Sequence, residues 1–98
     1  MEIAGGTLKK IVMDAVRRVP AEQAPIVAWA FACGVEVAKK TRPMDFKDGV
    51  LRVEVPDFRW RSQLVDMSRQ YVSMLREYSG QDVKRIEFVV KDAGLEQK

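Results

Sequence analysis

The chain has 98 residues, of which 47% are hydrophobic, and a net charge of +3. This length allows one small domain with its own core and excludes a second domain. The sequence has no histidine and one cysteine, which excludes Ser-His and Cys-His catalysis, histidine-based zinc sites and an internal disulfide. It also has no phosphate-cradling glycine motif. We therefore expect no enzymatic activity, no metal or cofactor, and no small-molecule substrate.

The sequence also lacks the marks of a membrane or exported protein. No apolar stretch approaches the roughly 20 residues of a membrane span, and the start of the chain has no basic segment followed by an apolar one. Together with the lone Cys33, this predicts a cytoplasmic protein. Residues 7–91 carry 16 basic and 11 acidic side chains, or +5, which is compatible with a polyanionic partner.

Two helices are predicted in the first part of the chain, after a leader of residues 1–6 that we expect to be flexible. Thr7 is the expected N-cap of the first helix, and Pro20 ends it. Its apolar face consists of Leu8, Ile11, Val12, Ala15, Val16 and Val19. The second helix is expected to begin near Pro25. Its buried residues are expected to be Ile26, Trp29, Ala30, Cys33 and Val37.

Gly34 lies inside the predicted second helix, where glycine costs about 1 kcal/mol relative to alanine. This predicts that another element passes close to it. We expect Cys33 to be a small buried hydrophobe rather than a reactive thiol. The segment Lys39-Lys40-Thr41-Arg42-Pro43 ends the helix with cations near the negative end of its dipole.

The clearest short signal is Asp48-Gly49 between two alternating segments. Both residues tolerate a positive φ, so the pattern predicts a tight hairpin over residues 44–55. The expected register pairs Lys47 with Val50, Phe46 with Leu51, Met44 with Val53, and Asp45 with Arg52.

A long helix from Asp57 to Gly80 is the element around which the rest is organised. Asp57 is its expected N-cap, and Gly80 suits the left-handed residue that closes the last turn. A continuous apolar stripe must be buried, and it consists of Trp60, Leu64, Met67, Tyr71, Met74, Leu75 and Tyr78. The flank of this stripe carries Arg61, Arg69 and Arg76.

A third strand is predicted over residues 83–90, where Ile86, Phe88 and Val90 face the core. A right-handed crossover makes this strand parallel to residues 51–55. The order is therefore α-α-β-β-α-β. We expect a two-layer α+β domain over residues 7–91, with helices on one face of a three-stranded sheet, and a flexible tail at residues 92–98.

Two basic clusters at the ends of predicted elements are candidate phosphate contacts. The first cluster is Lys39, Lys40 and Arg42, and the second is Arg59 and Arg61. The alternative is that these side chains form ordinary solvated surface. Phe58 and Trp60 are candidate partner contacts, although inward packing is favoured for Trp60. Trp29 is expected to lie in the core.

The ordered set of motifs over residues 26–90 resembles the DciA-type loaders of the bacterial replicative DNA helicase. The resemblance rests on Trp29 with Gly34 five residues on, Thr41-x-Pro43, Asp48-Gly49-x-Leu51-x-Val53-x-Val55, Trp60 with Leu64, and Ile86-x-Phe88. It implies a KH-like fold, contact with the helicase, and DNA binding as a second property.

The sequence departs from the family pattern in three respects. Lys40 stands where the family usually has a histidine, which adds a fixed charge. The family often carries a long polar extension, whereas the sequence after Lys91 consists of residues 92–98. If that extension contributes to loading, we expect either weak helicase binding or a shortened or divergent member of the family. The Gly-x-x-Gly loop by which KH domains clamp a nucleic-acid backbone is absent, so that binding mode is not carried over.

These observations predict a non-enzymatic replication accessory that binds the replicative helicase and contacts DNA through the basic clusters. An alternative is a stand-alone single-stranded DNA or RNA binding module with no helicase partner, which stacking by Phe58 or Trp60 would favour. A third interpretation is a plain interaction or dimerisation domain, suggested by Val89 on the outer face of the sheet.

Overall fold

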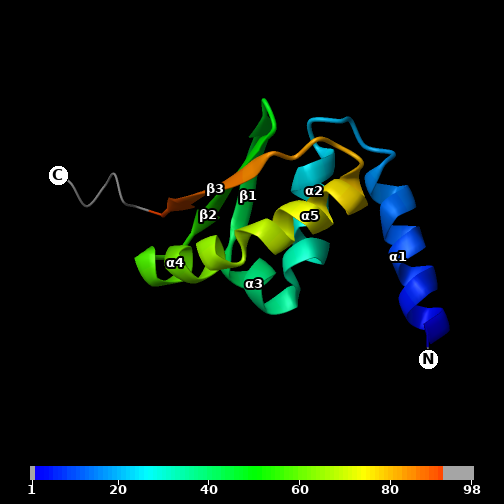
Figure 1. Cartoon of the computed structure of the whole chain (residues 1–98), viewed down its shortest axis with the longest axis horizontal. Helices are drawn as coiled ribbons and strands as arrows, with labels where there is room; N and C mark the ends of the chain where they lie inside the picture. The colour runs from blue at the N-terminus through cyan, green and yellow to red at the C-terminus, as the bar shows by residue number, and fades with distance from the viewer. Residues whose placement is uncertain (1, 92–98) are drawn as a thin grey trace.

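The computed structural model describes residues 2–91, so Met1 and the predicted tail at residues 92–98 lie outside the described residues. The described chain forms five helices and three strands (Figure 1). In chain order these are α1 Glu2–Val16, α2 Ala24–Cys33, α3 Val35–Lys40, β1 Arg42–Lys47, β2 Val50–Val55, α4 Phe58–Asp66, α5 Ser68–Ser79 and β3 Arg85–Val90. The mixed α+β class predicted from the sequence is confirmed.

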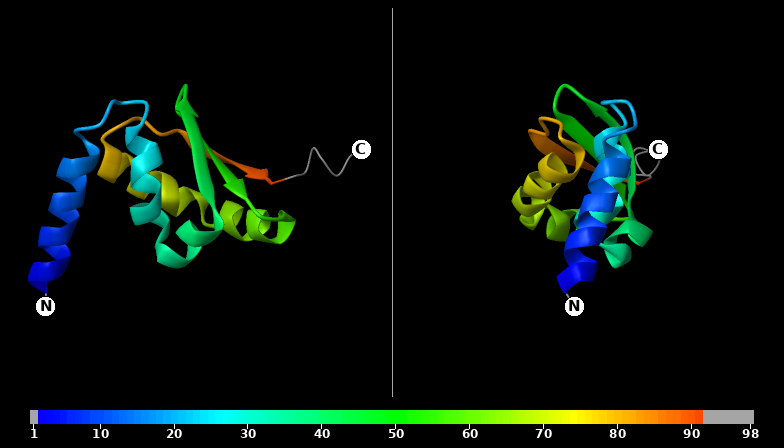
Figure 2. Two further views of the ribbon diagram at one scale, coloured as in Figure 1. Left: turned by 180° about the vertical axis from the view of Figure 1, so that it is seen from behind. Right: turned by 90° about the vertical axis from the view of Figure 1, so that its right-hand side faces the viewer.

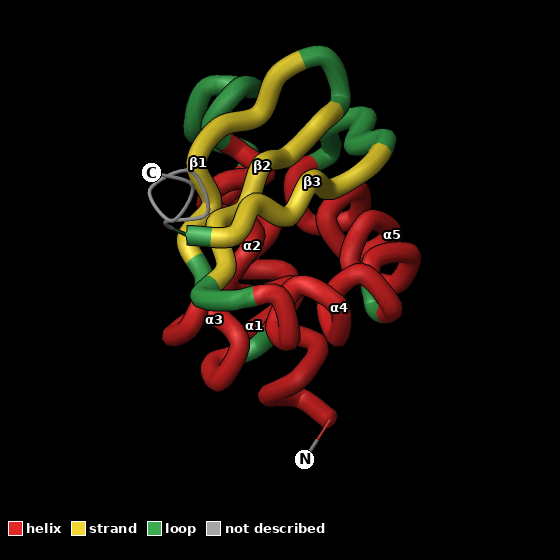
Figure 3. The backbone as a smooth tube through the Cα atoms, turned by 90° about the vertical axis from the view of Figure 1, so that its left-hand side faces the viewer, coloured by secondary structure: helices red, strands yellow, loops and turns green. Residues whose placement is uncertain are grey.

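The three strands form one sheet in the order β1-β2-β3, with β1 antiparallel and β3 parallel to the central strand β2. The helices gather on one side of this sheet (Figure 3). Contacts to the sheet come from α2, α4 and α5, whereas α1 packs on α5 and α2. The inward residues Leu51, Val53 and Val55 of β2 are at most 1% exposed, so the core lies between the two layers.

The hairpin forms at the predicted turn, with positive φ at both Asp48 and Gly49. Three of the four predicted pairs are observed: Lys47 with Val50, Phe46 with Leu51, and Asp45 with Arg52. The fourth pair was wrong, because Pro43 lies opposite Val53 and the register shifts between Pro43 and Asp45. This irregularity near the strand start is where proline, which has no N–H to donate, is tolerated.

The first helix differs from its prediction at its start and on its face. Helix α1 begins at Glu2, so Thr7 lies inside it and is not its N-cap. Glycine has a low helix propensity but does not exclude a helix, and the glycines at residues 5 and 6 lie within α1. Val12 and Val16 are buried as predicted, but Ile11 is 58% exposed. The apolar face is narrower than predicted because α1 packs at the edge of the bundle (Figure 2).

Gly34 ends the second helix instead of lying inside it. Its φ of 90° and ψ of 164° are outside the helical region, and the chain restarts as α3 at Val35. Apart from its two chain neighbours, no described residue has an atom within 4 Å of the place where a Cβ would stand, so the expected close approach of another element was wrong. The glycine is needed for its backbone conformation. In α2, Ala28 and Ala32 are buried and Ala30 is exposed, so the predicted burial of Ala30 was wrong.

The predicted long helix is two helices that meet at Met67. Asp57 caps the first of them, because its Oδ1 accepts a hydrogen bond from the Trp60 amide at 2.9 Å. Gly80 closes the second with the expected left-handed φ of 73°. Met67 departs from helical geometry at ψ 0° and is 42% exposed, so its predicted place on the buried stripe was wrong. The break lets α4 pack on β2 and β3 while α5 packs on α2.

Trp29 is the largest fully buried side chain in the described core, at 1% exposed. Its ring meets Tyr71 edge-on at a centroid distance of 5.3 Å and lies 6.1 Å from Phe88. It therefore joins α2, α5 and β3 at one point, as expected for a core aromatic. Among the described residues, no helix is long and apolar enough to cross a membrane.

Candidate nucleic-acid interface

The first predicted basic cluster lines a pocket where α3 passes into β1. We call this the α3–β1 pocket. Its lining consists of Lys39, Lys40, Thr41, Arg42, Glu54, Val55, Pro56 and Lys91, and its volume is about 480 Å³. Four cations and one carboxylate therefore face a single depression. This is the type of surface that attracts phosphate groups.

A partly buried hydrogen-bond relay fixes the backbone of this pocket. The Trp29 indole Nε1–H donates to the Thr41 hydroxyl at 2.9 Å, and that hydroxyl donates to the Val37 carbonyl at 2.8 Å. The relay anchors the junction between α3 and β1 to the core. Lys39 and Lys40 are held just before Thr41, and Arg42 just after it.

The ion pairs at the pocket are long, and Glu54 is the one half-buried side chain among their four partners. Arg42 Nε lies 3.5 Å from Glu54 Oε1, and Lys39 Nζ lies 3.9 Å from Glu36 Oε2. Pairs of this kind contribute about 0–1 kcal/mol, so an anionic ligand competes with them readily. Within residues 9–91, where side chains are described, neither Lys40 nor Lys91 has an ion-pair partner.

Lys91 is a member of the pocket that sequence reasoning missed. It follows β3 directly, and its amide donates to the Val55 carbonyl at 2.7 Å. This bond sets it beside the end of β2, next to the pocket. The sequence predicted that β3 runs parallel to β2, which is part of what places Lys91 here. It did not predict which strand of the hairpin β3 would pair with.

The second predicted cluster does not join the first, since neither Arg59 nor Arg61 lines the α3–β1 pocket. Arg59 is exposed in the first turn of α4. The Arg61 guanidinium has a structural role, because its Nε donates a hydrogen bond to the Phe88 carbonyl at 3.0 Å. This bond connects α4 to β3.

The two candidate partner contacts have different surroundings. Phe58 opens α4 and is 63% exposed, two residues after Pro56 of the pocket. Trp60 is half-buried and packs against the core. Of the two predicted aromatic contacts, Phe58 is therefore the one that remains available for an outside surface, close in sequence to the α3–β1 pocket.

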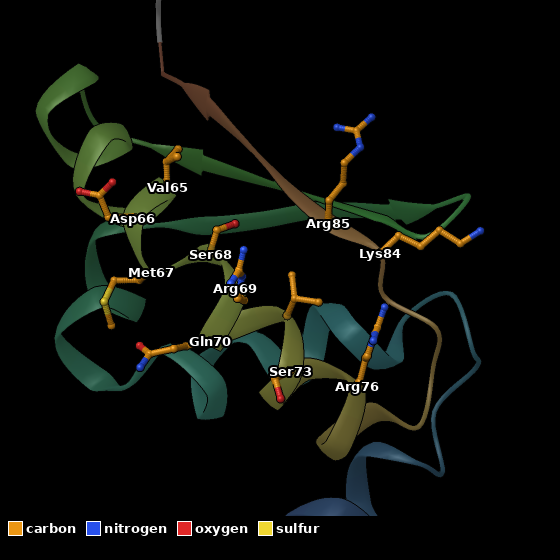
Figure 4. Close-up of a pocket in the computed structure, with 11 residues that line it drawn as sticks. Val65, Asp66, Met67, Ser68, Arg69, Gln70, Ser73, Arg76, Lys84 and Arg85 are labelled. Carbon is orange, nitrogen blue, oxygen red and sulfur yellow. The ribbon is translucent and has the colours of Figure 1, made fainter.

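A second basic depression lies between α4, α5 and the start of β3 (Figure 4). We call it the β3-edge groove. Its cations are Arg69, Arg76, Lys84 and Arg85, its one carboxylate is Asp66, and its apolar residues are Val65, Met67 and Val72. Sequence reasoning placed Arg69 and Arg76 on the flank of one helix. It did not connect them with Lys84 and Arg85, which the crossover brings alongside.

The surroundings of the lone cysteine disfavour its reactive thiolate form. Cys33 is half-buried, and this burial raises the pKa of its thiol to about 11. At pH 8 the reactive thiolate fraction is therefore on the order of one in a thousand. We expect iodoacetamide to alkylate Cys33 at least tenfold more slowly in the folded chain than in urea at pH 8. Because a raised pKa preserves the neutral thiol, the folded-state rate should keep rising until about pH 11. A rate that levels off below pH 9 would contradict this assignment.

Of the comparisons with known proteins, the one with protein-family models supports the resemblance to the DciA-type loaders. No curated protein matches this chain. The family model described as "Dna[CI] antecedent, DciA" matches residues 4–88, which is most of the chain. The chain therefore belongs to the DciA family, and this membership implies a role in DNA replication as a loader of the bacterial replicative helicase.

Proposed function

We propose that this chain binds the bacterial replicative helicase and, while bound, contacts the DNA backbone through the α3–β1 pocket. The family match supports the helicase partner. The observation that carries the DNA contact is the convergence of Lys39, Lys40, Arg42 and Lys91 on one depression. Lysine side chains are flexible point charges and arginine adds a planar fork, so together they suit phosphates spaced along a strand.

The lining of the α3–β1 pocket favours a contact that does not read sequence. Its described residues include no aromatic ring on which a base could stack and no side-chain amide that could read a base edge. Contact with phosphates alone positions a nucleic acid without selecting its sequence.

Phe58 is the proposed helicase contact nearest to this pocket. An exposed aromatic at the start of a capped helix presents a large apolar area on a rigid support. Pro56 lines the pocket and Phe58 follows two residues later, so the two proposed contacts belong to one stretch of chain. Arg59 adds an exposed cation beside Phe58 and would extend the DNA path toward the helicase.

Replacing Phe58 with serine is expected to weaken helicase binding at least tenfold. The side chain is 63% exposed, so the free energy of unfolding should change by only about 0.5 kcal/mol. The matched control is Val27→Ser, which removes a 40% exposed side chain from α2. Purified helicase from the same organism is the ligand, and retention on immobilised chain is the measurement. If F58S bound the helicase as tightly as the unmodified chain and V27S lost binding, the helicase contact would be assigned to α2 instead.

A further inference from the structure

The lining of the β3-edge groove includes Lys84 and Arg85, and the free edge of β3 continues from there to Ile86 and Phe88. β3 is an outer strand, because the sheet order is β1-β2-β3. The Arg85 amide donates to the Gly49 carbonyl and the Lys91 amide donates to the Val55 carbonyl, so alternate residues of β3 bond toward β2. The backbone groups of Ile86 and Phe88 must then point away from β2, toward the free edge. Figure 4 shows β3 along one side of the groove and α5 along the other.

Two arginine side chains already donate hydrogen bonds to backbone carbonyls of residues along this edge. Arg76 Nε donates to the Val83 carbonyl at 2.7 Å, and Arg61 Nε donates to the Phe88 carbonyl at 3.0 Å. These bonds mark the two ends of an open stretch. Between them, Ile86 offers both an N–H and a C=O, and Phe88 offers an N–H, with no strand beside them in the described chain. The opening therefore fits a short extended segment.

The charges of the groove define the segment that would fit. Four cations and one carboxylate line it. Within residues 9–91, Arg69 and Lys84 have no ion-pair partner, while Arg76 and Arg85 have only distant ones, Asp82 at 3.8 Å and Glu87 at 3.9 Å. An occupant would therefore carry negative charge. Val65, Met67 and Val72 supply apolar surface for alternate side chains of that occupant.

We propose that the β3-edge groove binds an acidic, extended segment of a partner protein, which adds a fourth strand beside β3. Its backbone pairs with Ile86, and its carboxylates face the four cations of the groove. Main-chain hydrogen bonds supply affinity in this mode of recognition, and side-chain charges supply selectivity. A nucleic acid also carries negative charge, and its bases have N–H and C=O groups, but its backbone does not repeat these groups at the spacing of a strand, so an extended peptide fits this edge better. The site is separate from the proposed contacts at Phe58 and the α3–β1 pocket.

The test uses the full chain and two acetylated, amidated heptapeptides of alternating glutamate and valine. The second peptide carries N-methyl groups at alternate residues, which remove backbone donors and leave its charge unchanged. We expect the first peptide to shift the ¹H–¹⁵N signals of Ile86 and Phe88, and the second to bind at least tenfold more weakly. Equal binding of the two peptides, or no binding of either, would overturn the proposal.

Charge variants and a nucleic-acid probe separate this site from the proposed function. The double variant Arg69→Glu/Lys84→Glu should bind the first peptide at least tenfold more weakly. The control is the double variant Lys10→Glu/Arg18→Glu, which has the same change in charge at exposed positions in the N-terminal part of the chain. It should bind the first peptide as tightly as the unmodified chain does. A ten-residue deoxythymidine oligonucleotide should leave the Ile86 and Phe88 signals unmoved. Shifts there with the oligonucleotide and none with the peptide would assign the groove to nucleic acid instead. No outcome here depends on whether the helicase binds.

Discussion

Replacing Trp29 with alanine is expected to lower the free energy of unfolding by about 3–5 kcal/mol. The side chain is 1% exposed, and its ring packs on both Tyr71 and Phe88. Its loss would leave a cavity where helices and sheet meet, and Thr41 would lose the indole donor. Domains of this size are stable by roughly 5–15 kcal/mol, so the variant should be close to unfolding. Urea denaturation followed by circular dichroism measures the difference.

Two milder variants separate packing from the hydrogen bond. Trp29→Phe keeps much of the apolar volume but removes the indole donor to Thr41. Thr41→Val keeps the tryptophan and leaves its buried Nε1–H without an acceptor, which costs about 1–3 kcal/mol. We expect W29A to be the most destabilised of the three. If T41V equalled W29A, the relay rather than packing would dominate this part of the core.

Neutralising the α3–β1 pocket should have the largest effect on DNA binding. We expect the triple variant Lys39→Gln/Lys40→Gln/Arg42→Gln to bind a single-stranded oligonucleotide roughly 100-fold more weakly at 0.1 M salt. The slope of log K against log salt should become shallower by about 2, because three phosphate contacts are lost. All three side chains are exposed, so the fold should be unaffected. Fluorescence anisotropy over a range of salt concentrations gives both quantities.

The control for this variant has the same net charge. Lys10, Arg18 and Lys47 are exposed cations outside the pocket, and their replacement by glutamine should leave the salt slope nearly unchanged. An equal loss in both triple variants would show that overall charge, rather than the pocket, determines affinity. Arg59→Gln added to the pocket variant then tests whether the second predicted cluster belongs to the path. Arg61 is left intact, because its change would also detach α4 from Phe88.

Several features set by local chemistry were predictable from the sequence, although the N-cap predicted at Thr7 was wrong. The Asp48-Gly49 turn and the caps at Asp57 and Gly80 depend on a few neighbouring residues, and all of them were confirmed. The breaks at Gly34 and Met67 were not predicted. Helical periodicity continues across each of them, so the apolar pattern gave no sign of either break, although the break at Gly34 uses a positive φ that glycine adopts readily.

The candidate site divides in the same way. Lys39, Lys40 and Arg42 are neighbours in sequence at an element junction, so their convergence could be foreseen. Lys91 joins them only through the pairing of β3 with β2, which is a long-range contact. The β3-edge groove needs both the break between α4 and α5 and the crossover to β3. No short pattern in the sequence encodes that juxtaposition.

The most direct test of the proposed function is calorimetric titration of the chain into the replicative helicase of the same organism, with and without a single-stranded oligonucleotide. We expect saturable binding with a dissociation constant in the micromolar range or tighter, about −8 kcal/mol or more favourable. Binding should persist when the oligonucleotide is present. No heat with the helicase, together with salt-sensitive binding to the oligonucleotide alone, would contradict the loader role and indicate a stand-alone nucleic-acid binding module.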